Sequence, residues 1–266
     1  MNLNLRQHLK FTARGFLAHA KPSPLLIGIA ALALMTLLDL MGSKVTNEAV
    51  RTEALYKASQ QFLENQNYEH YLNVVNSNQP TVMQNILSAL ISLMVLMIAT
   101  GIVIYVISEC RWHKGSFGNL FDALPILLRV FWYQFITTVL TVLWGMLLIV
   151  PGIIASYSYR QGLYILLDHP EMSVMECIRA SKHMMNGHKM ELFRLDLSFF
   201  GWVFAQTFAT NALAIALGDA YLPAFLLLPM NAFIRMYMEF TFFLYYEHLC
   251  GVRYDSRVPN ADAAGQ

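Results

Sequence analysis

Three charged side chains lie within otherwise apolar stretches of the chain and are the first candidates for chemistry: Arg160, Arg235 and Glu239. An arginine at the centre of a bilayer costs about 3 kcal/mol on insertion scales, so such a side chain is expected to face other helices and to be paired. Arg235 and Glu239 are four residues apart and can pair on one helix face. We also expect Arg160 to contact Glu239 from a neighbouring helix. These residues fit a structural clamp, a polar path for an ion or headgroup, or simple extension of Arg160 to the membrane surface.

A run of hydroxyl groups precedes Arg160, formed by Ser156, Tyr157, Ser158 and Tyr159. Hydroxyls of this kind commonly form hydrogen bonds between helices inside a membrane. The same polar stripe would also line a hydrated cavity, and the residues alone leave both interpretations open.

A second group of candidates lies on a short amphipathic helix predicted at 173–186. Ser173 and Glu176 form a capping-box pattern at its start, and Asn186-Gly187 supplies a stop. One face is predicted to be apolar and to lie on the membrane, and the other to present basic groups to water and anionic headgroups. The apolar face comprises Val174, Ile178, Ser181 and Met185, and the basic face comprises Arg179, Lys182 and His183. The helix either only joins two spans or binds headgroups or a protein partner.

Several classes of function are disfavoured by what the chain does not contain. The eight histidines and three cysteines are not spaced as metal ligands, and no nucleotide-binding or hydrolase motif occurs. The formal net charge of +1 gives no basic field for nucleic acid. We therefore expect no metal, no cofactor, no catalytic residue and no nucleic-acid partner.

The composition indicates the elements that must position these groups. The chain is 56% hydrophobic and only 13% charged, whereas soluble domains carry about 25% charged residues. An all-α, polytopic membrane bundle is the expected fold, with about six spans built as helical hairpins and with short interfacial helices. The predicted spans are Leu25–Leu38, Ile86–Ile107, Phe131–Val150, Gly152–Leu167, Leu195–Leu217 and Ala224–Leu244.

Pro151-Gly152 decides the number of spans, because it is either the turn of a hairpin or a kink in one helix. The turn places both termini, the loop around Arg111 and the basic 173–194 region on one side. Positive residues of short loops stay in the cytoplasm. We therefore predict a multi-pass protein of a bacterial plasma membrane with both termini cytoplasmic.

The remaining segments complete the predicted layout. Residues 1–24 are a basic, cytoplasmic amphipathic segment, and 25–252 form a single transmembrane domain. Residues 43–80 are predicted to be a polar, helical, extracytoplasmic insertion, and 253–266 a disordered tail. A faint internal repeat pairs "LLIVPGIIASYSYRQGLYILLDHP" with "LLLPMNAFIRMYMEFTFFLYYEHL", so that Asp168-His169 corresponds to Glu247-His248. Two similar hairpins or chance would explain it.

One stretch of about 55 residues resembles the bacterial integral-membrane family called domain of unknown function 975. The shared motifs run PGII-x-SYSY, Y-x-L-x-D-x-P, S-x-x-E-x-I-x-x-S, M-x-G-HK and L-x-LSF-x-GW, found here at Pro151–Tyr159, Tyr164–Pro170, Ser173–Ser181, Met185–Lys189 and Leu195–Trp202. The resemblance implies a multi-span membrane protein with no established activity or cofactor. Family members usually carry a small residue where this chain has Arg160, so a role of Arg160 would be particular to this chain.

Two functions from different classes follow as expectations. The first is a non-enzymatic scaffold or accessory factor whose partners are membrane lipids and a cytoplasmic or membrane protein. The alternative is a transporter-like protein with a polar path through Arg160 and Glu239. A cavity that reaches both residues would favour transport, and a solid apolar core would favour the scaffold.

Overall fold

The structure is a computed structural model that describes residues 3–218 and 221–252. Within these ranges the secondary structure is helical and no strand occurs, which confirms the all-α prediction. The chain divides into two compact units, residues 33–96 and the remainder. The sequence had been interpreted as one domain with an insertion. The predicted tail at 253–266 lies outside the described residues.

The smaller unit contains the polar segment predicted at 43–80, which is helical as expected. Helices α3 (Glu48–Asn65) and α4 (Tyr68–Ser77) pack against each other. The pair is closed by a hydrogen bond of 2.6 Å from Arg51 Nε to the carbonyl oxygen of Asn78. Helices α2 (Pro24–Val45) and α5 (Val82–Trp112) each begin in one unit and end in the other.

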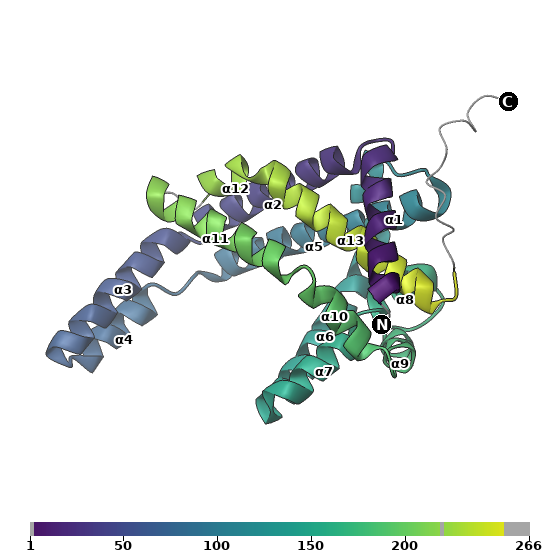
Figure 1. Cartoon of the computed structure of the whole chain (residues 1–266). Helices are drawn as coiled ribbons and strands as arrows, with labels where there is room; N and C mark the ends of the chain where they lie inside the picture. The colour runs from purple at the N-terminus through teal and green to yellow at the C-terminus, as the bar shows by residue number, and fades with distance from the viewer. Residues whose placement is uncertain (1–2, 219–220, 253–266) are drawn as a thin grey trace. The chain divides into compact units, whose positions relative to one another are not determined.

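The larger unit contains a helical hairpin made by α6 (Leu127–Leu147) and α7 (Ile149–Tyr159), which lie side by side (Figure 1). The chain reverses at Leu148, whose backbone is extended (φ −159°, ψ 142°). Pro151 and Gly152 lie in the first turn of α7, where the missing N–H of proline has little cost. The structure therefore has the predicted turn and not a kink, but the turn is three residues earlier than Pro151.

Close backbone approach holds this hairpin together. A Cβ on Gly152 would lie 2.7 Å from the Cα of Gly145 in α6. Thr137, Thr141 and Gly145 recur every four residues along α6, which is the small-residue spacing that lets membrane helices approach closely.

After the hairpin the chain forms α8 (Gly162–Asp168), α9 (Val174–Met184) and α10 (Lys189–Leu197). Two 3₁₀ turns, η1 (Phe117–Leu120) and η2 (Leu124–Ile126), lead from α5 to α6. Helices α11 (Phe200–Leu217), α12 (Leu222–Leu226) and α13 (Leu228–Leu249) follow. Helix α13 supplies many of the buried residues of this unit, including Phe240, Phe243 and Tyr245.

The basic segment predicted at 1–24 contains α1 (Leu3–His19), which packs along α13. Lys10 Nζ donates to the carbonyl oxygen of Ser198 at 3.2 Å and lies 4.0 Å from the ring centre of Phe199. Arg14 Nε donates to the hydroxyl of Tyr237 at 3.1 Å. This side of α1 is therefore bound to protein.

Four helical segments of the described chain are long and apolar enough to cross a membrane: Pro24–Val45, Val82–Trp112, Phe117–Leu147 and Phe200–Leu217. They correspond to the first, second, third and fifth predicted spans. The fourth predicted span is broken into α7 and α8, and the sixth is α13, which carries Arg235, Glu239 and Glu247. The break leaves α7 and α8 each too short for a span, and the charged side chains make α13 less apolar than the other spans.

Candidate functional site

The break between α7 and α8 is held open by one aromatic residue of α6. The hydroxyl of Tyr133 donates to the carbonyl oxygen of Tyr159, which lies where the helix ends. The ring also occupies the space beside Gly162, where a Cβ would lie 2.5 Å from the Tyr133 hydroxyl oxygen. A side chain thus replaces a helical hydrogen bond at the break, as required for irregular backbone inside a bundle.

Arg160 follows directly and forms its ion pair with Asp196 of α10. The Nη1–Oδ2 distance is 2.7 Å, and the Tyr157 hydroxyl donates to the same Oδ2 at 2.8 Å. The guanidinium carbon of Arg160 lies 4.4 Å from the ring centre of Phe242. The residue expected to approach Arg160 was Glu239. Asp196 was not among the residues expected to lie near Arg160.

Glu239 pairs instead with Arg235 within α13, at 2.8 Å between Nη2 and Oε1. The predicted intrahelical pair is therefore present. The predicted Arg160–Glu239 contact is wrong, because the carboxylate of Asp196 lies closer to Arg160. Both arginine side chains remain partly exposed, at 39% for Arg160 and 45% for Arg235.

The hydroxyl run before Arg160 is divided between two environments. Ser158 and Tyr159 are buried, and the carbonyl oxygen of Ser158 accepts from the Ser181 hydroxyl at 2.9 Å. Ser156 is exposed and donates to the Ile153 carbonyl oxygen at 2.8 Å. The run therefore supplies both contacts to neighbouring helices and polar surface.

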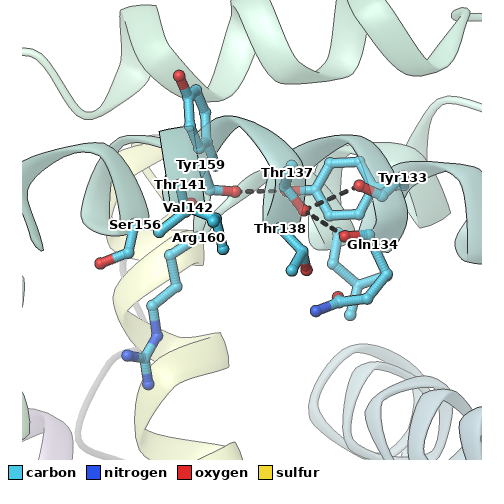
Figure 2. A pocket seen from close by; sticks show the side chains of 10 residues that line it. Tyr133, Gln134, Thr137, Thr138, Thr141, Val142, Ser156, Tyr159 and Arg160 are labelled. Carbon is cyan, nitrogen blue, oxygen red and sulfur yellow. Dashed lines mark hydrogen bonds between the residues drawn. The ribbon is translucent and has the colours of Figure 1, made fainter. Parts of the chain in front are cut away.

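That polar surface belongs to a cavity of about 380 Å³ between α6 and the end of α7 (Figure 2). We call it the α6–α7 cavity. The side chains of Gln134, Thr138, Ser156 and Arg160 point to the same side of the hairpin in Figure 2. The other lining residues are Tyr133, Thr137, Thr141, Val142, Tyr159 and Leu163. The cavity reaches Arg160, and Glu239 is not part of its lining.

A second charge cluster joins the ends of three helices. Arg111, in the last turn of α5, donates to both carboxylate oxygens of Asp168 in α8, at 2.8 and 2.9 Å. It also donates to Glu247 of α13, at 2.7 Å from Nε to Oε1. The Tyr246 hydroxyl donates to Asp168 Oδ2 at 2.8 Å. We call Arg111, Asp168, Tyr246 and Glu247 the Arg111 cluster.

The faint internal repeat of the sequence contains two members of this cluster. The two acids, Asp168 and Glu247, are the residues that correspond in the faint internal repeat, and the structure brings both to the same guanidinium. Their common partner, Arg111, lies outside both repeats. From the sequence, Arg111 was interpreted only as part of a positively charged loop.

The predicted helix at 173–186 is α9, and its capping box is present. Ser173 N–H donates to Glu176 Oε2 at 2.7 Å, and Glu176 N–H donates to Ser173 Oγ at 3.4 Å. The Ser173 N–H and the Ser173 hydroxyl both donate to Glu176 Oε2 and hold the pKa of Glu176 below its ordinary value. Gly187 has φ +85°, which suits the predicted helix stop.

The environment of α9 differs from the prediction on one face. Ile178, Ser181 and Met185 are buried, and α9 packs on α6, α7 and α8. Its apolar side therefore contacts protein and not lipid, because the broken α7–α8 segment leaves a surface for it to cover. The basic face behaves as expected. Arg179, Lys182 and His183 are exposed.

The described residues contain no group of three or more His, Cys, Asp or Glu side chains that could hold a metal ion. The thiols of Cys110 and Cys177 are buried, whereas Cys250 is exposed.

A helical fold, several helices long and apolar enough to span a membrane, and charges paired between helix ends define a helical, membrane-associated protein. The chain belongs to the family described as "Protein of unknown function (DUF975)", whose model matches residues 9–252. This match confirms the family that the motifs at 151–202 indicated. No curated protein and no solved structure was found to match the chain.

Proposed function

We propose that the protein is a non-enzymatic scaffold or accessory factor of a bacterial plasma membrane, with both termini in the cytoplasm. It acts by binding lipids through its spans and a protein partner through its cytoplasmic surface. The observation that carries the proposal is the pairing of charges in the larger unit. Arg160 pairs with Asp196, Arg235 with Glu239, and Arg111 with Asp168 and Glu247.

Such pairs support a structural role for these groups. A carboxylate already bound to a guanidinium is a poor general base, because the cation stabilises its charged form. Arg111 also connects elements that are far apart in sequence, as a clamp must. The α9 basic face, formed by Arg179, Lys182 and His183, is exposed on a helix that packs against other helices. A basic face of this kind suits an acidic partner or anionic headgroups.

The test compares partners retained by the full-length chain after gentle crosslinking and purification in a mild detergent. The wild type is compared with Arg179→Ala/Lys182→Ala, which changes only exposed side chains of α9. A matched control is Lys57→Ala, which removes an exposed lysine of α3 whose side chain is 68% exposed. We expect the α9 variant to lose a specific crosslinked protein that the wild type and the control retain. Identical partner profiles for all three chains would contradict the scaffold role.

One observation favours the second candidate, a transporter-like protein. The α6–α7 cavity is lined by several polar side chains, including Arg160, as a polar path would be. Its lining ends short of Glu239 and Arg235, so the cavity supplies a binding pocket more readily than a continuous path. Reconstituted vesicles that show no flux of ions or polar solutes beyond protein-free vesicles would exclude this candidate.

A further inference from the structure

The α6–α7 cavity contains polar groups that the protein does not use. Within the described chain, the side chains of Gln134, Thr138 and Thr141 make no hydrogen bond to protein, although all three line the cavity. Arg160 donates through Nη1 to Asp196, and its Nε and Nη2 have no protein acceptor among the described residues. Polar groups exposed on an apolar helix are costly in a membrane unless something satisfies them.

The order of these groups along the hairpin is fixed by two contacts. Tyr133 meets Tyr159 near the start of α6, and Gly145 meets Gly152 near its end. Arg160 therefore lies near the level of Thr137, with Gln134 on one side along α6 and Thr141 on the other (Figure 2). At 1.5 Å per residue, the distance from Gln134 to Thr141 along α6 is about 10 Å. The cavity thus combines one cation with neutral hydrogen-bonding groups that lie within about 10 Å along α6.

The surroundings of the cavity are apolar and exposed. Val142 lines the cavity, and Phe131 and Phe135 on the same side of α6 and Ile153 of α7 are also exposed large hydrophobic residues. A ligand that satisfies the cavity and the apolar side chains around it needs an anionic group, hydrogen-bond acceptors close to that group, and hydrocarbon. A guanidinium with free donors suits a phosphate oxygen, and hydroxyl and amide donors suit ester carbonyl oxygens.

We propose that the α6–α7 cavity binds a glycerophospholipid, with the phosphodiester on Arg160 and the ester carbonyls on Gln134, Thr138 and Thr141. The acyl chains then lie over the exposed apolar side chains of α6 and α7. This inference rests on the membrane location in the proposed function and specifies one site for the lipid contacts. Arg160 also pairs with Asp196, so its positive charge is partly offset. This suits a phosphodiester, which carries a single negative charge.

The experiment measures lipid binding to the full-length protein in a neutral detergent by native mass spectrometry, with phosphatidylglycerol as the probe. Thr138→Val/Thr141→Val is the main variant, because it removes two hydroxyls that hold no protein contact and keeps the side-chain shape. Thr207→Val on α11 is the matched control, an exposed threonine outside the cavity. We expect apparent binding to weaken about tenfold or more in the double variant, since each lost hydrogen bond contributes about 1 kcal/mol. Binding to the control should be unchanged.

Two further arms separate the sources of the anion. Inorganic phosphate at millimolar concentration should not displace the lipid, and diacylglycerol, which lacks the phosphate, should bind more weakly. Displacement by phosphate would mean a site for a soluble anion and would overturn the lipid assignment. Equal binding of diacylglycerol would overturn the role of Arg160.

Equal phosphatidylglycerol binding by the double variant and the wild type would overturn the site itself. That outcome is distinguishable from failure of the scaffold role. If the lipid binds as expected and the α9 variant keeps its protein partner, only the scaffold role is contradicted. If the α9 variant loses its protein partner and Thr138→Val/Thr141→Val binds lipid normally, only the lipid site in the cavity is contradicted.

Discussion

Arg111 is the side chain with the largest predicted effect on stability. Its guanidinium pairs with both Asp168 and Glu247, and the Glu247 side chain is only 3% exposed. Arg111→Ala leaves two carboxylates without a cation, and breaking a buried pair in this way costs about 3–5 kcal/mol. We expect a large fall in the unfolding temperature in detergent. Arg111→Lys keeps the charge but not the paired geometry, so its loss should be intermediate.

The control for this comparison is Arg179→Ala, which removes an exposed arginine of α9. It should change the free energy of unfolding by no more than about 0.5 kcal/mol. Equal unfolding temperatures for Arg111→Ala and Arg179→Ala would show that the Arg111 cluster does not stabilise the fold.

Glu176 gives α9 a predictable dependence on pH. Hydrogen bonds from the Ser173 backbone and hydroxyl lower the pKa of Glu176 from its ordinary value of 4.5. A carboxyl whose pKa is lower in the folded state stabilises that state fully above its unfolded pKa. The stabilisation is lost as the pH falls through the folded value, so α9 should open more readily below about pH 4.5.

Hydrogen–deuterium exchange of α9, corrected for the intrinsic effect of pH, measures this opening. Glu176→Gln should flatten the pH dependence, and Ser173→Ala should weaken the helix start by about 1 kcal/mol at neutral pH. The exposed pair of Glu53 and Lys57 lies on α3, so Lys57→Ala serves as the control and should leave exchange in α9 unchanged. The same pH dependence in Glu176→Gln and wild type would refute the role of the capping box.

Individual partners were predictable from sequence only where they are local. The Ser173–Glu176 box and the Arg235–Glu239 pair span three and four residues, and helix geometry alone determines them. Asp196 and Arg111 acquire their partners through packing of distant segments, which no spacing rule describes. The contact assigned to Arg160 was wrong for this reason.

The α6–α7 hairpin depends on one close contact between helix backbones. A Cβ on Gly152 would lie 2.7 Å from Gly145 Cα, which is backbone that cannot move aside. Gly152→Ala should therefore separate the helices and cost about 1–3 kcal/mol. Gly145→Ala is a matched control, because a Cβ there meets nothing within 4 Å. Its effect should stay within about 1 kcal/mol.

Unfolding temperature in detergent measures both glycine variants. The informative quantity is the difference between them, because each adds one methyl group to the same hairpin. If Gly145→Ala lowers the unfolding temperature as much as Gly152→Ala, the packing described for this hairpin is incorrect.

The helices themselves were largely predictable, and their interruptions were not. Long apolar runs predict α2, α5 and α6, because an uninterrupted apolar run of this length is typical of a membrane-spanning helix. The turn was predicted at Pro151, but proline is also favourable in the first turn of a helix, and Pro151 occupies that position in α7. The break at Tyr159–Gly162 depends on a hydroxyl of α6, so α7 itself carries no signal for it.

The arrangement of helix ends in the larger unit supports the proposed orientation. Arg129, in the first turn of α6, donates to the carbonyl oxygens of Pro170 and Met172 at 2.8 and 2.5 Å. The segment before α9 thus returns to the end of the hairpin where α6 begins. The Arg111 cluster brings the last turns of α5, α8 and α13 together. The loop at 111–126 and α9 therefore lie at the same end of the α6–α7 hairpin, which is the arrangement that the proposed orientation requires.

Labelling of single cysteines with a membrane-impermeant maleimide in spheroplasts tests this orientation. Cys177 is a poor reporter because it is buried, and burial raises the pKa of its thiol. Two reporters replace exposed lysines in a Cys250→Ser background, Lys182→Cys on α9 and Lys57→Cys on α3. We expect Lys57→Cys to react in intact spheroplasts and Lys182→Cys only after permeabilisation, because short basic segments are retained in the cytoplasm. Reaction of Lys182→Cys before permeabilisation would invert the orientation and move the α9 basic face away from any cytoplasmic partner.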